Sequence, residues 1–197
     1  MSLFKNKYRI ESTRLPNWDY GSAGYYFVTI CTKGRDAFFG EIIKGEMGLS
    51  RIGEIVSEEW LKTAEIRPNV KIDAWVVMPN HVHLIVVITH KINAPQPEAR
   101  RRITPERETP QRGVSTRRTD KALEKWTGNT LGSIIGQFKG KCTKRILEEG
   151  FVDFEWQTRF YDRILRSDES LHKARVYIAV NPENWDNDKE NLAGLFM

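Results

Sequence analysis

The stretch from Val76 to Ile88, VVMPNHVHLIVVI, constrains the fold more than any other part of the sequence. Two apolar segments flank Pro79-Asn80, a dipeptide typical of tight turns. We therefore expect a hairpin of two strands, over residues 72–78 and 81–88. Because side chains alternate between the two faces of a strand, one face of the second strand is fully apolar and must be covered by helices. It consists of Val82, Leu84, Val86 and Ile88.

Two histidines interrupt this apolar run. His81 and His83 share the opposite face with Ile85 and Val87, and their Cα atoms are expected about 6.6 Å apart. We expect this face to open to solvent beside the turn, where two imidazoles at that spacing can converge on one metal ion. On spacing alone, two partly exposed strand histidines with hydrogen-bond partners are an equally good interpretation.

Patterns on either side of the hairpin predict the remaining elements. Aromatic and β-branched residues predict a strand over 25–32, and residues 39–43, followed by KGEMGL, predict a weaker strand and a turn. Apolar residues spaced by three and four predict a helix over 50–66. Later in the chain, Thr130 can cap a helix over 131–149, and alternation predicts a strand over 160–165.

A last helix is expected to begin after Ser167, a good N-cap residue, and to end near Asn181 because Pro182 follows. The order strand, helix, two strands, helix, strand, helix predicts an α+β fold. Specifically, we expect a ferredoxin-like antiparallel sheet with helices packed on one face, plus an additional C-terminal helix.

A basic segment separates the two halves of this fold. Residues 94–121 hold four of the eight prolines and eight basic residues against four acidic ones, so +4 of the net charge of +5 lies there. Such a segment has too few apolar residues to bury a core. We expect one domain over residues 1–197, interrupted by a disordered insertion at about 92–125. The arginines Arg100, Arg101 and Arg102 could follow a phosphate backbone, or the segment could be a solvated tail.

Composition and local sequence limit the classes of protein to which this chain can belong. The longest aliphatic run, Leu84 to Ile88, is far shorter than the roughly 20 residues of a membrane span. The first residues, MSLFKNKYRI, lack the apolar core of a secretory signal, so we expect no membrane partner. Cys31 and Cys142 are typical of reduced thiols in a cytoplasmic protein. A pI near 9.2 mildly favours an anionic partner.

The last predicted helix places Tyr177 and Asn181 four residues apart, hence one turn apart on one face. Asn181 offers a carbonyl oxygen as a metal ligand, and Tyr177 offers a phenol that could attack an electrophile. On spacing alone, the more ordinary interpretation is a half-buried aromatic side chain and a helix C-cap.

Three motifs in this order, MPNHVH, WQTRFYDRILR and YIAVNPENW, resemble the HUH-type single-tyrosine transposases, and most closely their REP-associated branch. The segments RLPNWDYGSAGYYFVTICTKGR and LGSIIGQFKGKCTKR are similar to the same group, so the resemblance covers nearly the whole chain apart from the insertion and the ends. It implies an enzyme that cuts and rejoins single-stranded DNA at the foot of imperfect hairpins. Such enzymes form a 5′-phosphotyrosine and release a 3′-hydroxyl, and they act as monomers or homodimers.

The resemblance also implies roles for particular residues. His81 and His83 match the two metal-binding histidines of the HUH motif, Asn181 matches the third metal ligand, and Tyr177 matches the nucleophile. An amide ligand and a phosphate favour Mg²⁺ or Mn²⁺, although imidazoles also accept Zn²⁺. A free phenol has a pKa of about 10 and is a weak nucleophile. A divalent ion that offsets charge on the phosphate would help it.

Two further groups of side chains are candidates for contact with DNA. The first mixes a cation with aromatic rings ahead of the first strand: Arg14, Trp18 and Tyr20. The second leads into the strand before the last helix: Trp156, Gln157 and Arg159. Stacking platforms for unpaired bases use such side chains. A packed N-terminal arm and a core tryptophan are the alternatives.

Two other functions fit parts of the sequence. One is a non-catalytic protein that binds structured single strands on its sheet, as RNA-binding ferredoxin-like domains do. The other is a metal-dependent phosphodiesterase that uses water, with Tyr177 in a structural role. Because both the histidine pair and the tyrosine–asparagine pair are intact, we favour the transposase interpretation.

Overall fold

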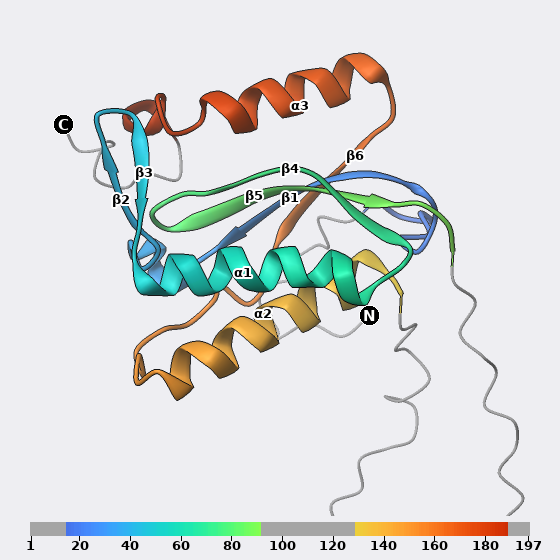
Figure 1. Cartoon of the computed structure of the whole chain (residues 1–197). Coiled ribbons are helices and arrows are strands. Elements are labelled where there is room, and N and C mark those ends of the chain that lie inside the picture. The colour runs from blue at the N-terminus through green and yellow to red at the C-terminus, as the bar shows by residue number, and fades with distance from the viewer. Residues whose placement is uncertain (1–14, 92–128, 189–197) are drawn as a thin grey trace, which may run out of the picture.

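The computed structural model describes residues 15–91 and 129–188 of the 197-residue chain (Figure 1). Four strands form the main sheet: β1 (Gly24–Cys31), β4 (Val70–Val77), β5 (His81–Ile88) and β6 (Tyr161–Leu165). The helices are α1 (Arg51–Ile66), α2 (Leu131–Glu148) and α3 (Asp168–Val180). A separate hairpin pairs β2 (Gly40–Ile43) with β3 (Glu46–Leu49).

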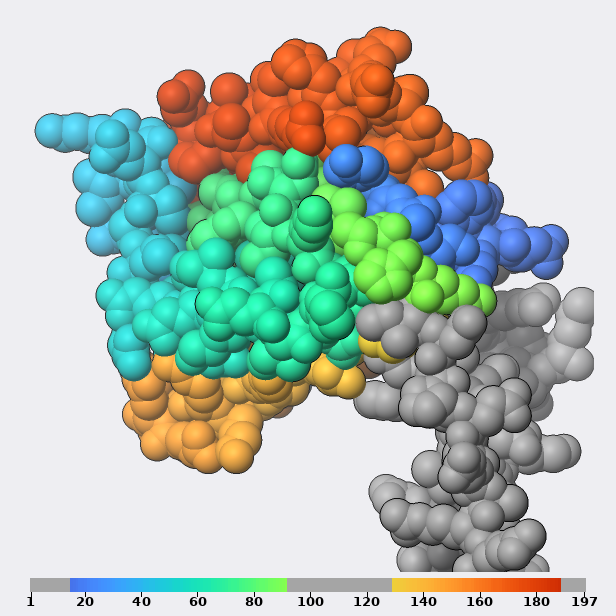
Figure 2. All heavy atoms as spheres, turned by 45° about the vertical axis from the view of Figure 1, so that its right-hand side comes forward, coloured from blue at the N-terminus to red at the C-terminus, as the bar shows by residue number. Residues whose placement is uncertain are grey.

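The main sheet has the strand order β4-β5-β1-β6, and each neighbouring pair is antiparallel. Figure 1 shows α1 and α2 together on one face of the sheet and α3 alone on the other. The predicted α+β, ferredoxin-like fold with an additional C-terminal helix is therefore confirmed, and the additional helix forms a layer of its own. In Figure 2 this layer lies across the top of the molecule against the strands.

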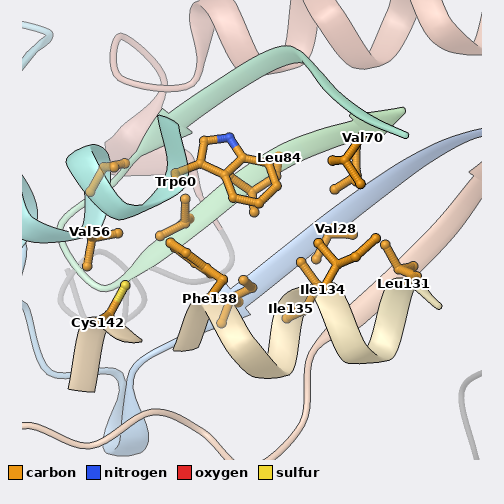
Figure 3. Close-up of a cluster of buried hydrophobic side chains, with 14 of the residues drawn as sticks. Val28, Val56, Trp60, Val70, Leu84, Leu131, Ile134, Ile135, Phe138 and Cys142 are labelled. Atoms are coloured by element: carbon orange, nitrogen blue, oxygen red, sulfur yellow. The ribbon is translucent and has the colours of Figure 1, made fainter. Parts of the chain in front are cut away.

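The main core lies between the sheet and the helix pair α1–α2. The face of β5 that was predicted to be covered is fully buried, with Leu84 0% exposed. Trp60 from α1 meets Phe138 from α2 edge-on, with ring centroids 5.3 Å apart, in a cluster that also contains Leu84 and Val28 (Figure 3). Burying each such large apolar side chain contributes about 1.5–3 kcal/mol, so this layer holds β1 and β5 firmly.

The helices begin where their cap residues predict. The hydroxyls of Ser50, Thr130 and Ser167 each accept a hydrogen bond from a backbone N–H in the first turn of α1, α2 and α3 respectively. A hydroxyl in this position satisfies one of the four N–H groups that a helix start leaves without a partner. At the other end of α3, Asn181 is the C-cap residue, directly before Pro182.

The structure differs from the sequence-based expectation in two places. The segment predicted as a turn after residue 43 contains a second strand, β3, because Lys44 and Gly45 both take positive φ angles and close a tight hairpin.

The face of β5 that carries the histidines was predicted to open to solvent, and this prediction is wrong. α3 covers it, so His81 is 0% and His83 2% exposed.

The basic insertion predicted at 92–125, with Arg100, Arg101 and Arg102, lies outside the described residues, and so does Arg14. Among the helices that the structure describes, none is long and apolar enough to cross a membrane.

Candidate metal and tyrosine site

The two histidines of β5 point their Nε2 atoms at each other, 3.0 Å apart. Their Nδ1 atoms are held from behind: His81 Nδ1 lies 2.9 Å from Asn80 Oδ1, and His83 Nδ1 lies 2.9 Å from Thr29 Oγ1. Because an amide oxygen only accepts, His81 carries its hydrogen on Nδ1 and presents a lone pair at Nε2. A hydrogen-bonded Nδ1 that leaves Nε2 available is the usual arrangement of a metal-binding histidine.

Helix α3 brings Tyr177 and Asn181 to this histidine pair. The phenol oxygen of Tyr177 lies 3.3 Å from His83 Nε2, and the two rings meet edge-on at 5.1 Å between centroids. Phe27 stacks on His83 at 5.2 Å and also meets Tyr177 edge-on at 6.0 Å, so the three rings contact one another. Asn181 is 2% exposed, and its Oδ1 is buried with no hydrogen-bond partner among the described residues. The structure thus brings together all four residues that the sequence selected for the site.

Asp188 joins the site and was missed by the sequence analysis. Its Oδ2 accepts hydrogen bonds from Asn181 Nδ2, at 3.2 Å, and from the Tyr177 hydroxyl, at 3.4 Å. The residue follows a short 3₁₀ helix, Trp185–Asn187, which turns the chain back towards β5. No periodic pattern links it to Asn181, so sequence spacing gave no signal for it.

These side chains form a set of donors that fits a divalent cation. One ligand atom from each of His81, His83 and Asp188 can be chosen so that all three lie within 4.8 Å of one another. The buried Asn181 Oδ1, which lacks a hydrogen-bond partner in the described structure, is a further oxygen donor. Burial of such an oxygen costs free energy unless a cation or a donor satisfies it. Two imidazole nitrogens with hard oxygens are compatible with Mn²⁺ and Mg²⁺ as well as Zn²⁺.

The surroundings of Tyr177 keep its phenol protonated. Burial raises the pKa of Tyr177 above its ordinary value of 10.0, and the negative charge of Asp188 raises it further. Side-chain hydrogen bonding with Asn181 acts in the opposite direction but is the smaller effect. The protein groups alone therefore do not activate this phenol, and a nearby positive charge would be needed to favour the phenolate.

The position of α3 depends on a small set of contacts. A satellite cluster of buried apolar residues joins the helix to the sheet: Ile85, Leu165, Leu171 and Ile178. At the edge, the guanidinium of Arg175 donates two hydrogen bonds to the Asp73 carboxylate, at 2.8 and 2.6 Å. Asp73 lies at the irregularity between Ile72 and Trp75, where the register of β4 against β5 shifts. This bidentate pair ties the helix to β4 two residues before Tyr177 in the chain.

An open cavity of about 1240 Å³ lies beside the tyrosine. Its lining includes His83, Tyr177 and Asn181 together with Tyr161 and Arg163 of β6. The cavity is large enough for several groups of a polymeric substrate, since small-ligand pockets measure roughly 300–1,000 Å³. The nucleophile candidate is accessible from it, because Tyr177 is 39% exposed.

Two predicted DNA-contacting residues ahead of β1 have packing contacts. Tyr20 is buried in the main core, and its hydroxyl accepts a hydrogen bond from the backbone N–H of Leu15. The indole of Trp18 donates to the Tyr26 hydroxyl, and Arg166 lies over its ring. These contacts favour the packed-arm interpretation for Tyr20, while contact of Trp18 with DNA stays a prediction.

The group before β6 lies apart from the cavity lining. Trp156 packs against Phe39, Phe154 and Phe138, as a core residue does. The residues Trp156, Gln157 and Arg159 are all absent from the lining of the cavity beside Tyr177. Arg159 is exposed, so its contact with DNA stays a prediction.

Comparison with solved structures places this fold in a class. The structure of a REP-associated tyrosine transposase bound to a REP hairpin is similar, with a TM-score of 0.54 at 17% sequence identity, covering 87% of this chain and 73% of that one. The fold is therefore transposase-like.

At the level of sequence, an uncharacterised protein of Haemophilus influenzae (strain ATCC 51907 / DSM 11121 / KW20 / Rd) is 33% identical over 183 residues, which cover 91% of each chain. The chain belongs to one family with this Haemophilus influenzae protein. No protein-family model matches the sequence.

Proposed function

We propose that this protein is a metal-dependent single-stranded DNA endonuclease and strand transferase of the HUH single-tyrosine type. The observation that carries the proposal is the meeting of Tyr177 with His83, at 3.3 Å, beside the unsatisfied Oδ1 of Asn181. The transposase-like fold and the three sequence motifs support the same conclusion. Because all these residues come from one chain, a single copy can assemble the site, whether the protein acts as a monomer or a homodimer.

In the proposed reaction, Tyr177 Oη attacks the phosphorus of a DNA phosphodiester. A bond forms between the phenol oxygen and phosphorus, and the bond from phosphorus to the 3′-oxygen breaks. The leaving 3′-oxygen takes up a proton and becomes a hydroxyl, while the 5′ end stays on the protein as a phosphotyrosine. The phenol proton passes to a base, for which Asp188 Oδ2 is placed at 3.4 Å. The covalent bond conserves the energy of the cleaved phosphodiester, so rejoining needs no nucleotide cofactor.

A divalent ion, Mg²⁺ or Mn²⁺, would be held by His81, His83 and Asn181, with Asp188 as an additional oxygen donor. When bound, such an ion supplies Lewis-acid polarisation of the phosphate and compensates the negative charge that Asp188 and the reacting oxygens bring together. The protein's own contribution is geometric. β5 fixes the imidazoles, and α3 fixes the phenol and the amide one helical turn apart.

The proposed substrate is single-stranded DNA that carries hairpins or palindromic repeats. The solved transposase that shares this fold is bound to a REP hairpin, and the same class of DNA is proposed for this chain. A protein that acts on DNA in this way would work in the cytoplasm, in transposition or in the processing of repeated elements.

A covalent-adduct assay tests this proposal. The protein is incubated with Mg²⁺ or Mn²⁺ and labelled single-stranded hairpins from its own genome, and the products are separated under denaturing conditions. We expect a labelled protein–DNA adduct and a fragment with a free 3′-hydroxyl. Cleavage without an adduct would instead support a hydrolase that uses water. Binding of hairpins with neither cleavage nor adduct would support a non-catalytic binding protein.

A further inference from the structure

The edge strand β6 presents two exposed side chains to the cavity beside Tyr177. Tyr161 and Arg163 are two residues apart, so both point to the same face of the sheet. Tyr161 is 46% exposed, Arg163 is also exposed, and both line the cavity. Neither belongs to the metal and tyrosine site described above.

Strand register places this pair relative to the histidines. Tyr161 pairs with Thr29, which in turn pairs with His83, so the three residues form one row across β6, β1 and β5. Neighbouring strands are about 4.8 Å apart, which puts Tyr161 about 10 Å from His83 along the row. Arg163 pairs with Phe27, the residue that stacks on His83. Both side chains therefore lie on the sheet face that carries His83, on the strand beyond β1.

The opposite wall of the cavity is the first half of α3, which contributes Ser170, Lys173 and Ala174. A second, smaller cavity of about 390 Å³ shares Arg163 and Ser170 with the first and continues towards Arg166. The two cavities adjoin, because they share lining residues of β6 and of the start of α3, and we call them together the trough. A strand can occupy both adjoining cavities, whereas a compact small molecule would need only one.

The chemistry of Tyr161 and Arg163 is unused within the described part of the chain. Their side chains make no hydrogen bond or ion pair with residues 15–91 or 129–188. In contrast, the exposed Lys173 on the facing wall is paired with Glu169, at 2.5 Å. An exposed aromatic ring beside an uncompensated guanidinium is the combination with which proteins bind unpaired nucleotides.

We propose that Tyr161 and Arg163 hold the unpaired DNA next to the scissile phosphate, with Tyr161 stacked on a nucleobase and Arg163 bound to a backbone phosphate. This inference rests on the proposed function and deepens it, because it names the part of the substrate that the trough takes. A stacked duplex does not present free base faces, so the pair selects a single strand. Base stacking on one ring is tolerant of sequence, so Tyr161 sets the strand's position rather than its sequence.

Binding measurements without cleavage test this inference separately from the catalytic proposal. We use the full chain with Tyr177→Phe in the presence of a chelator, and follow the fluorescence anisotropy of a labelled oligothymidylate. Tyr161→Ala is expected to weaken binding by about 5-fold to 140-fold, because stacking of one base is worth about 1–3 kcal/mol. Tyr161→Phe, which keeps the ring, is expected to bind like the parent protein.

Arg163→Gln tests the phosphate contact. We expect the slope of log affinity against log salt concentration to become shallower by about 0.7, the value for one phosphate contact on a single strand. The matched controls are Tyr25→Ala, an exposed tyrosine on the same sheet face outside the cavity lining, and Lys144→Gln, an exposed cation on α2. Both controls are expected to bind like the parent.

Several results would overturn the inference. One is unchanged affinity in Tyr161→Ala together with an unchanged salt slope in Arg163→Gln, which would make the two residues a solvated strand edge. Equal losses on duplex DNA, or losses confined to an oligouridylate, would also contradict it. If the wild-type protein forms adducts while the variants bind normally, the inference fails and the proposed function stands. If no adduct forms but the variants lose single-strand binding, the catalytic proposal fails and the trough remains a binding site.

Discussion

The two faces of the main sheet differ in how they are covered. On one face, α1 and α2 bury a continuous apolar layer that includes Leu84, Trp60 and Phe138. On the other, α3 alone is held by a satellite cluster of four buried apolar residues within the described chain. The same strand, β5, contributes to both. The densely packed face fixes its backbone, and the sparsely packed face leaves room for imidazoles, a phenol and an open cavity. Stability and chemistry are thus separated by the alternation of side chains along one strand.

Removal of the phenol oxygen should have the largest effect on adduct formation and almost none on stability, which depends mainly on the densely packed face. Tyr177→Phe is expected to reduce covalent adduct formation by at least about 10³-fold, because loss of a nucleophile removes the covalent route. The free energy of unfolding should change by less than about 0.5 kcal/mol, since the residue is exposed on the sparsely packed face. Denaturing gels and urea titration measure the two effects. Adduct formation by the variant would assign the nucleophile to another residue.

Removal of the proposed Mg²⁺ or Mn²⁺ ion should also affect only the site between α3 and the sheet. Chelation is expected to abolish adduct formation, and Mn²⁺ at about 100 times its Kd should raise the free energy of unfolding by about 2.7 kcal/mol. His83→Ala should lose both effects, because it removes a proposed ligand. Thermal unfolding with and without Mn²⁺ measures this stabilisation. A stabilisation that persists in His83→Ala would place the ion elsewhere.

Two adjacent residues of β5 compare the faces directly. Leu84→Ala, in the main core, is expected to cost about 2–5 kcal/mol of unfolding free energy, because it opens a cavity between two helices and a sheet. Ile85→Ala should cost less, near the lower end of that range, since α3 can move towards the sheet. We expect Ile85→Ala to reduce adduct formation more than Leu84→Ala does in the folded protein. Equal costs in urea titrations would show that the two faces are packed alike.

The main-core side also contains a buried charge whose effect on stability depends on pH. Burial opposes ionisation of Glu59, but hydrogen bonds from Arg145 and Lys62 outweigh it and lower the pKa of this carboxyl. The folded state therefore binds its proton less readily than the unfolded state. The resulting stability is fully present above the ordinary glutamate pKa and is lost as the pH falls through the lowered value. Glu59→Gln should cost about 1–3 kcal/mol at neutral pH and less in acid, as urea titrations at several pH values would reveal. A cost independent of pH would contradict this account.

Loss of the ion pair at the edge of α3 should have only a small effect on stability. Arg175→Ala is expected to cost at most about 1 kcal/mol, because the pair with Asp73 is partly exposed and surface ion pairs contribute little. Adduct formation should nevertheless fall several-fold, since the pair fixes the helix that carries Tyr177. The exchanged double variant Asp73→Arg with Arg175→Asp should recover part of the rate. No recovery would indicate that Arg175 acts by another route.

Much of this arrangement was predictable from local patterns. The apolar alternation of β5, the cap residues Ser50, Thr130 and Ser167, and the turn at Pro79-Asn80 each have a short-range cause, so the elements were placed nearly correctly. Hydrophobic periodicity does not report which face of a sheet a half-apolar helix will cover. For that reason the burial of His81 and His83 under α3 was not foreseen.

Asp188 shows a second limit of prediction from sequence, because spacing does not reveal contacts that form only in the folded chain. It reaches the site through a single turn of 3₁₀ helix after the end of α3, and its partners are set by tertiary contact rather than by spacing. Tyr161 and Arg163 gave a weak signal, because their motif was recognised while their role was not. Their significance depends on strand order, which places β6 at the edge of the sheet with only β1 between it and the histidine strand β5.

The hydrogen bond from His81 to Asn80 has an entropic consequence. Asn80 is 3% exposed, and its own amide nitrogen donates to the Arg35 carbonyl oxygen at 3.1 Å, so the acceptor for His81 is itself immobile. The rotational freedom of the imidazole is therefore lost when the hairpin folds, not when a ligand arrives. In the proposed site, a cation would therefore meet a donor that is already oriented and already in the required tautomer. The turn residue Asn80 would thereby raise the affinity for the ion without being a ligand itself.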